Sequence, residues 1–233
     1  MTLCVYAIGS PVRGRLSITG LAGESLTTVR VGALAAFVGA MPRVPKPGDD
    51  HLRDYDRILK TLSRRSAALL PARYGTRVRD RDELHVILSA RQASLRRQLR
   101  QVRGRVQMTV RMVTPHTPDT PVARALSRSR GEPNKARPTG RHSGSEYLRA
   151  RARESARQRD IPQFKPLRLA VRRWVRAERV EKRGSIATVY HLIPRGSAAA
   201  YRRALARRAA ENEVRVVISG PWPPYAFADP LEL

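Results

Sequence analysis

The residue types that usually carry chemistry are few in this sequence, and they are widely separated. The histidines form neither an HExxH motif nor a pair at helical spacing; they are His51, His85, His116, His142 and His191. The sequence also lacks the GxSxG turn of serine hydrolases, the phosphate-binding P-loop and the GxGxxG turn that binds dinucleotides. We therefore predict no catalytic residue, no cofactor and no metal site.

The short acidic clusters have a simpler explanation than cation binding. Asp49 and Asp50 precede a histidine and could hold a cation, but carboxylates at the start of a predicted helix commonly cap it or interact favourably with its dipole. Asp80 and Asp82 open the next predicted helix in the same way. His191 lies in an alternating strand, and we interpret it as an exposed or hydrogen-bonded core residue rather than a catalytic base.

The apolar segments and the single cysteine indicate a cytoplasmic protein without a membrane span. Cys4 lies in the apolar run Leu3–Ile8, where we expect an inert buried thiol, and one cysteine excludes an internal disulfide and a multi-cysteine metal site. The most apolar stretch, Val31–Met41, is far shorter than the roughly 20 residues that cross a bilayer. No basic leader precedes the first apolar run, so we predict no signal peptide.

The formal net charge of +27 over 233 residues predicts attraction to polyanions. Arginine outnumbers lysine by 41 to 5, a bias that GC-rich codon usage would also produce. The densest basic tracts, 91–105 and 149–183, lack the interleaved aromatics of an RNA-binding sheet and any helix-turn-helix signature. Three interpretations stay open: a basic nucleic-acid-binding module, non-specific attraction to nucleic acid, and complementarity to an acidic protein partner.

Hydrophobic periodicity predicts an α+β protein with two domains, each with its own core. Residues 1–103 are expected to form a small sheet with two long helices. The strands are predicted at 3–8, 27–31 and 34–38, with the last two in a hairpin around Gly32. One helix begins at Asp49 or Asp50 and is stopped by Pro71, and the other runs from Asp80 to Gly104.

Residues 104–233 are expected to form a ferredoxin-like antiparallel sheet with helices on one face. Strands are predicted at 105–113, 186–193 and 213–219, a helix at 198–209, and further helices near Ser145 and Tyr147 and from Leu167 to Glu178. Residues 114–142 contain five prolines and almost no large apolar side chain, so we predict a mobile loop there. Residues 220–233 form a Pro/aromatic tail strap.

Two segments stand out as structural motifs or partner-binding surfaces. In Leu70–Thr76 (LPARYGT), Gly75 allows a turn, Tyr74 can anchor it, and Arg73 could fork onto a carboxylate or a main-chain carbonyl. In the tail, prolines stiffen the chain and rings can pin it to a core; the residues are Trp222, Pro223, Pro224, Tyr225 and Phe227. Structure is the simpler role for both segments. Partner contact is the alternative, and Pro221 with Pro224 also fits a PxxP ligand.

Five blocks, in order along the chain, resemble the gas vesicle accessory proteins of the GvpL/GvpF family. They are Leu3–Ile8 (LCVYAI), Val31–Val38 (VGALAAFV), Leu70–Thr76 (LPARYGT), Gly144–Leu148 (GSEYL) and Gly220–Phe227 (GPWPPYAF). The departures from the family pattern lie in residues 114–142 and in the arginine excess.

The resemblance implies two α+β domains and a role in gas vesicle assembly without catalysis. The implied partners are the hydrophobic major shell protein of the gas vesicle and other gas vesicle accessory proteins. The chain would act on them as a chaperone, a nucleator or a minor shell component, in the cytoplasm and at the gas vesicle.

Overall fold

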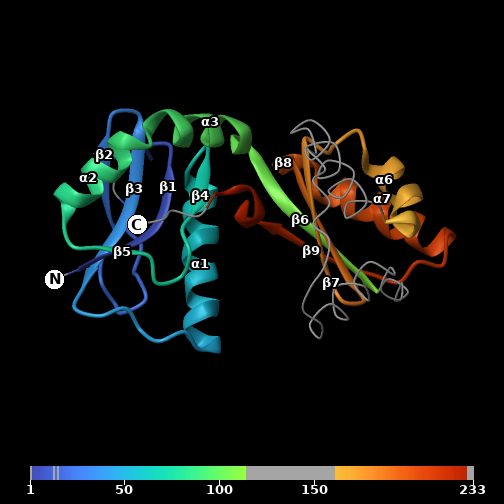
Figure 1. Cartoon of the computed structure of the whole chain (residues 1–233), viewed down its shortest axis with the longest axis horizontal. Helices are drawn as coiled ribbons and strands as arrows, with labels where there is room; N and C mark the ends of the chain where they lie inside the picture. Colours follow the sequence, from blue (N-terminus) through green and yellow to red (C-terminus); the bar gives the residue numbers. More distant parts are fainter. Residues whose placement is uncertain (1, 13, 15, 114–160, 230–233) are drawn as a thin grey trace, which may run out of the picture.

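The computed structural model describes residues 2–12, 14, 16–113 and 161–229. Two lobes lie side by side, each built on its own antiparallel sheet (Figure 1). The chain passes from the first lobe to the second after a helix at residues 92–102, and its C-terminal tail returns to the first lobe (Figure 1). The predicted loop at 114–142, the predicted helix at Ser145 and Tyr147, and tail residues 230–233 lie outside the described residues.

The first lobe contains a five-stranded sheet. Its strands are β1 (Thr2–Gly9), β2 (Thr27–Val31), β3 (Leu34–Met41), β4 (Leu69–Pro71) and β5 (Arg77–Val78). The order is β2-β3-β1-β4, and β5 also pairs with β1. The predicted hairpin is confirmed: Val31 pairs with Leu34, and Gly32 occupies the turn with a φ of 56°.

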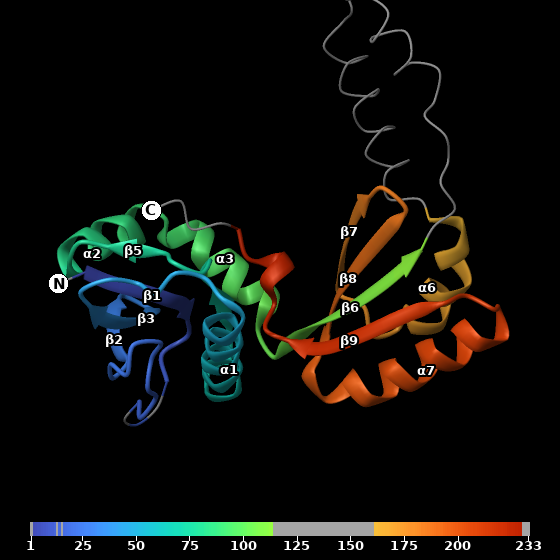
Figure 2. The ribbon, with the colours of Figure 1, turned by 90° about the horizontal axis from the view of Figure 1, so that it is seen from below.

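The sheet of the first lobe is covered on both faces, which explains why β1 is a continuous apolar run. On one face, Cys4, Tyr6 and Phe37 pack against α1 (Asp49–Arg65). On the other, Val5, Ile8 and Val38 pack against α2 (Arg81–Ala90) and α3 (Gln92–Val102) (Figure 2). Burial raises the pKa of the Cys4 thiol to about 12, as expected for an inert core cysteine.

Three predictions about the helices of the first lobe were wrong. The N-cap of α1 is Gly48, and Asp49 and Asp50 occupy the first turn instead. The helix ends at Arg65 rather than at Pro71, because Leu69–Pro71 pairs with β1 as strand β4, and this pairing outweighs the local helical pattern. The helix predicted from Asp80 to Gly104 is broken at Arg91 into α2 and α3, although Asp80 does cap α2 by accepting from the amide of Glu83.

The second lobe contains a four-stranded antiparallel sheet in the order β7-β8-β6-β9. Its described helices and strands follow the sequence β-α-β-β-α-β: β6 (Arg105–Val113), α6 (Lys165–Val171), β7 (Ala177–Arg183), β8 (Ile186–Pro194), α7 (Ala198–Glu211) and β9 (Val216–Trp222). Helices α6 and α7 lie on one face (Figure 2), where Val110, Met112 and Val189 pack with Leu167 and Leu205. The mixed α+β class is confirmed, whereas the division into two domains at residue 104 remains a prediction.

Strand β7 was missed, and the helix predicted from Leu167 to Glu178 was too long. Helix α6 ends at Val171, and Ala177–Arg183 pairs with β8 along its whole length, with Gly184 in the turn. The strand is an edge strand rich in charged residues, so it lacks the apolar alternation by which strands are recognised.

The final strand also departs from prediction, because it does not stop at Ser219. β9 begins at Val216 and continues through Gly220 and Pro221 to Trp222, which lies opposite Gln107. The pairing shifts register between Gln107 and Thr109. Pro221 is tolerated because β9 is an edge strand and one side of its backbone needs no partner in the sheet.

Gly220 should be the least replaceable glycine of the second lobe. Its φ is 113°, and an added Cβ would lie 2.7 Å from the Gln107 carbonyl oxygen. We expect Gly220→Ala to lower the free energy of unfolding by about 3 kcal/mol, measured by urea denaturation. Gly196→Ala is the matched control, because no heavy atom lies within 4 Å of its added Cβ, and it should be nearly neutral. Equal stability of the two variants would show that position 220 does not require glycine.

Candidate functional site

The C-terminal tail lies where the two lobes meet. We call this region of contact between the lobes the lobe junction. After β9 the chain makes a 3-10 turn, η3 (Tyr225–Phe227), which lies against β4. Phe227 is only 3% exposed and belongs to the apolar cluster of the first lobe, with Leu70 and Leu99. Leu192 of β8 joins the same cluster. One aromatic side chain of the tail is therefore buried in the core of the first lobe, together with a leucine from the sheet of the second lobe.

Two buried glutamines fix the main chain of the tail at this junction. The Gln107 side-chain oxygen accepts from the amide of Ala226 at 2.7 Å, and the Gln98 side-chain oxygen accepts from the amide of Asp229 at 3.1 Å. Gln98 lies on α3 and Gln107 on β6, so the tail bonds to both lobes. Buried glutamine side chains left without such partners would be costly, and these bonds therefore specify the path of the tail.

Trp222 and Tyr225 extend the junction to its solvent-exposed rim. The Lys60 ammonium lies 4.1 Å from the Trp222 ring centroid and 2.5 Å from the Asp56 carboxylate. The Tyr225 hydroxyl donates to the same Asp56 at 3.0 Å. The rim therefore combines a cation, a carboxylate and two rings from α1 and the tail.

Two prolines of the tail, Pro223 and Pro224, are buried whereas Pro221 is exposed, which bears on the PxxP alternative formed by Pro221 and Pro224. Pro223 and Pro224 are covered, and η3 follows them directly, so the tail is not extended throughout as predicted. A PxxP ligand presents its prolines on an accessible polyproline helix. The packing observed here favours the structural interpretation of this segment.

A second set of contacts crosses the junction near the start of β6. The Arg195 guanidinium donates to the Ser63 carbonyl at 2.7 Å, and the Arg195 amide donates to the Gly104 carbonyl at 3.0 Å. The Gly104 amide in turn donates to the Ala67 carbonyl at 2.8 Å. Gly104, where the chain crosses between lobes, is thus held from both sides.

The LPARYGT segment is held in place by its tyrosine. The Tyr74 hydroxyl donates to the Pro45 carbonyl at 3.0 Å, and its ring packs edge-on against Tyr55. Gly75 has a φ of 84°, which the turn requires. The Arg73 side chain is exposed and pairs with none of the described carboxylates, so the expected fork is not found there. The tail contacts the start of this segment, because η3 lies against β4. The Arg73 side chain lies outside the lobe junction.

A buried histidine–carboxylate cluster lies in the second lobe. His191 on β8 is fully buried; its Nδ1 lies 2.6 Å from the Tyr201 hydroxyl and its Nε2 lies 2.8 Å from Glu178 Oε2. The Arg168 guanidinium donates to the same carboxylate oxygen at 3.0 Å. An ionised Glu178 accepts the Nε2 proton, and Nδ1 of a neutral ring then accepts from Tyr201. Both ring nitrogens are engaged, as expected for a hydrogen-bonded core histidine.

The Glu178 carboxylate is held ionised by these partners. Burial alone would raise its pKa, but the hydrogen bonds from His191 and Arg168 outweigh burial and hold the pKa below the ordinary value of 4.5. Sequence analysis missed the cluster because it placed Glu178 in a helix, away from the strand that contains His191. Among the described residues, no group of three His, Cys, Asp or Glu side chains could hold a metal ion.

The face of the second sheet opposite α6 and α7 is only partly covered. Near the lobe junction it is closed by the tail, but no described helix covers its far end. Val113 pairs there with Ile186, and Val217 pairs with Arg111 of the same face. We call Val113, Ile186 and Val217 the sheet patch; they are 75%, 49% and 67% exposed. Three exposed β-branched side chains on one face, two of them directly paired, form an apolar surface suited to contact with another molecule.

These features describe a two-lobed α+β protein that exposes a rim of charged and aromatic side chains at the lobe junction and an apolar patch on its second sheet. Comparison with known proteins identifies the class: the chain belongs to the gas vesicle synthesis protein GvpL/GvpF family, whose model matches residues 3–229. This family consists of gas vesicle proteins and is not a known class of enzyme, and membership supports an accessory role in gas vesicles. No helix in the described parts of the chain is long and apolar enough to cross a membrane.

Two solved structures have the same fold. The gas vesicle protein GvpF from Anabaena sp. PCC7120 is 14% identical, with a TM-score of 0.70 over 98% of this chain and 96% of that one. GvpF from Microcystis aeruginosa is 12% identical, with a TM-score of 0.70 over 98% of this chain and 99% of that one. The chain has no match among curated protein sequences.

Phe227 should contribute strongly to stability, since it fills a space between the two lobes. We expect Phe227→Ala to lower the free energy of unfolding by about 3 kcal/mol, because it leaves a cavity in the shared cluster. Val217→Ala, at an exposed site, should change it by less than about 0.5 kcal/mol. Urea denaturation measures both. If Phe227→Ala does not fold, Phe227→Leu should show a smaller loss in the same direction. A Phe227 variant as stable as the wild type would show that the tail does not hold the lobes.

The histidine–carboxylate cluster predicts a pH-dependent contribution to stability. A carboxylate with a lowered pKa stabilises the fold above its unfolded pKa, and this contribution is lost as the pH falls through the folded pKa. We expect Glu178→Gln to lower stability by about 1–2 kcal/mol at pH 7, and the difference from wild type to shrink progressively below pH 4.5. Denaturation across this pH range tests the expectation. Glu181→Gln, on the exposed side of the same strand, is the control and should show little effect.

Proposed function

We propose that this chain is a gas vesicle assembly accessory protein that binds the hydrophobic major shell subunit and other accessory proteins. The observation that carries this proposal is the family match over residues 3–229. The protein would act in the cytoplasm and at the growing vesicle, as a chaperone, a nucleator or a minor shell component.

A shell subunit with large apolar faces creates a physical need for such a protein. In water these faces would drive uncontrolled association before the subunit reaches the growing shell. A protein that covers them temporarily needs a complementary surface and no active site. The affinity of such a protein for the shell subunit must also be limited, because the subunit has to dissociate before it joins the shell.

The sheet patch is the surface that we assign to the shell subunit. Val113, Ile186 and Val217 form the apolar centre, and Arg111 and Arg183 lie beside them on the same face. An apolar centre with a charged border is the usual composition of a protein-binding surface. Buried Pro223, Pro224 and Phe227 would act structurally by holding the lobes together. The exposed side chain of Arg73 is available for a second partner.

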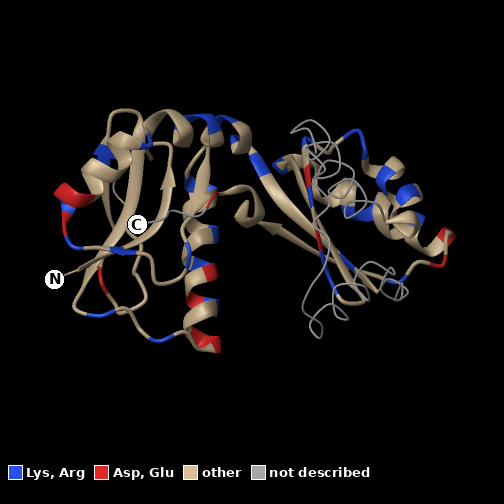
Figure 3. Ribbon diagram, in the orientation of Figure 1, with Lys and Arg blue, Asp and Glu red and all other residues tan. Residues whose placement is uncertain are grey.

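The distribution of charge supports a protein partner over sequence-specific nucleic-acid recognition. Basic residues lie on both lobes and do not form a single stripe (Figure 3). Some of them are paired along α1, where Lys60 contacts Asp56 and Arg53 contacts Asp50. Such a surface attracts polyanions weakly and without selectivity.

Co-expression with the shell subunit tests the proposed function. We expect the subunit to co-purify with the wild-type protein, and the Ile186→Asp/Val217→Asp double variant to retain at least about fivefold less, because two carboxylates would be buried against an apolar partner. Val86→Asp on α2 is the matched control, since Val86 is 67% exposed like Val217 but lies in the other lobe. Circular dichroism confirms that each variant folds.

Absence of the subunit from both soluble and vesicle-bound fractions of the wild-type protein would contradict the proposal. A salt-titrated gel shift addresses the nucleic-acid alternative. Binding that persists at physiological salt with a sequence preference would favour a nucleic-acid-binding module. Binding that collapses steeply with salt and ignores sequence would reflect the net charge alone.

A further inference from the structure

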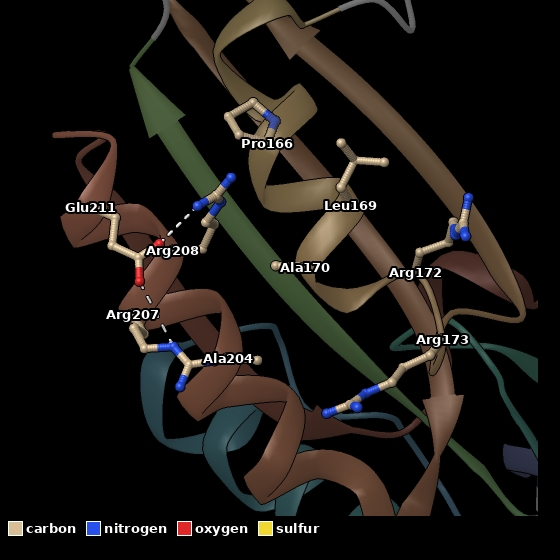
Figure 4. A pocket seen from close by; sticks show the side chains of 9 residues that line it. All are labelled: Pro166, Leu169, Ala170, Arg172, Arg173, Ala204, Arg207, Arg208 and Glu211. Atoms are coloured by element: carbon tan, nitrogen blue, oxygen red, sulfur yellow. Dashed lines mark hydrogen bonds and ion pairs between the residues drawn. The ribbon is translucent and has the colours of Figure 1, made fainter.

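Helices α6 and α7 enclose a groove on the outer face of the second lobe, on the side of the sheet away from the sheet patch. The hollow measures about 710 Å³ and is open to solvent. Figure 4 shows Leu169 and Ala170 on α6 and Ala204 on α7 lining it, with arginines on both sides. Small side chains along the facing helices leave room for a further chain to approach closely.

Positive charge predominates along this groove. It is lined by Arg172 and Arg173 at the end of α6 and by Arg207 and Arg208 on α7, against a single carboxylate, Glu211. Within the described part of the chain, neither Arg172 nor Arg173 pairs with a carboxylate. The Arg173 guanidinium instead lies 4.0 Å from the Trp174 ring centroid.

The one carboxylate in the groove shows what its arginines bind. Glu211 Oε2 lies 2.9 Å from Arg208 Nη1, and Glu211 Oε1 lies 3.9 Å from Arg207 Nε, so one carboxylate lies between two guanidinium groups (Figure 4). Guanidinium groups present paired N–H donors that match the two oxygens of a carboxylate. Arg172 and Arg173 offer the same donor groups to carboxylates of a partner.

The groove also has an apolar component that its charges do not explain. Leu169 is 67% exposed, although its neighbours Leu167 and Val171 on α6 are fully buried. A leucine that contributes little to its own core, beside Ala170 and Ala204, offers an apolar contact to another chain. A ligand that matches this groove must therefore combine carboxylates with apolar side chains.

We propose that the α6/α7 groove docks an acidic amphipathic helix from a partner protein. Its apolar side chains would contact Leu169, Ala170 and Ala204, and its carboxylates would pair with the arginines on either side, as in other helix-in-groove complexes. Nucleic acid fits this groove less well, because none of the described lining residues is an aromatic ring on which a base could stack, and Glu211 would repel phosphates. The groove and the sheet patch lie on opposite faces, so two partners can bind together.

The test uses a fluorescein-labelled helical peptide of about 18 residues, long enough to form helix, with leucines along one face and glutamates on its flanks. Its binding to the full chain is measured by fluorescence anisotropy at about 0.15 M salt. We expect Arg172→Glu/Arg207→Glu to weaken binding at least about tenfold, because two attractive pairs become repulsive. Leu169→Asp should weaken binding by a similar factor.

Matched variants at other positions distinguish binding in this groove from a general effect of net charge. Arg96→Glu/Arg97→Glu on α3 makes the same change of charge, and Val86→Asp introduces a carboxylate at a site as exposed as Leu169. Both should alter affinity by less than about twofold. Equal weakening by these controls would overturn the proposal, and so would absence of binding to the wild-type chain.

Two competitors identify the chemistry of the ligand. A peptide of the same composition, permuted so that its leucines are dispersed, should bind much more weakly; equal binding would show that charge alone is recognised. A single-stranded DNA of about 20 nucleotides should not displace the helical peptide at equal concentration. Displacement of the peptide from the wild-type chain at that concentration would overturn the proposal and assign the groove to nucleic acid instead. Since the shell subunit is absent from this assay, its outcome is independent of the proposed function.

Discussion

The arrangement of this protein depends on the burial of Phe227 between two sheets. Its ring lies among side chains of the first lobe, yet it arrives on a segment that continues directly from the last strand of the second. The amides of Ala226 and Asp229 are bonded to the side chains of Gln107 and Gln98, so an apolar contact and two directional bonds specify the same position. Displacing the ring would leave both a cavity and unsatisfied glutamines, and the two penalties reinforce each other. Together with the Arg195 and Gly104 contacts, this contact sets the relative position of the lobes and so the placement of the surfaces on them.

The sequence predicted the parts of the fold in which local pattern and tertiary environment agree. Leu3–Ile8 and the hairpin around Gly32 were found because an apolar run and a turn residue indicate the same structure. Strand β7 was missed because it is a charged edge strand, and β4 because its three residues follow a helical pattern and become a strand only by pairing with β1. The continuation of β9 through Pro221 was missed because an edge position removes the usual objection to proline. The aromatic tail and the tyrosine of LPARYGT were singled out correctly as notable, but the glutamines that receive the tail carry no sequence signal.

The second lobe presents surfaces of opposite chemistry on its two sides. The helices bury one face of the sheet and expose arginines outward, while the other face leaves β-branched side chains in water at its far end. Between them lies a fully satisfied cluster of His191, Tyr201, Glu178 and Arg168, which ties β7 and β8 to the helices. A histidine beside a carboxylate resembles a catalytic pair, but here both ring nitrogens are occupied and the ring is inaccessible. Its physical role is to fix the helices relative to the sheet, so that the two outer surfaces keep a constant geometry.

The polypeptide passes between the lobes twice, once at Gly104 and once at the prolines after Trp222. A single linker permits rotation in any direction, whereas two separated crossings leave easy motion only about the line that joins them. Any bending of this molecule would therefore be a hinge motion about that line, and twisting would strain both the covalent crossing at Gly104 and the non-covalent docking of the tail.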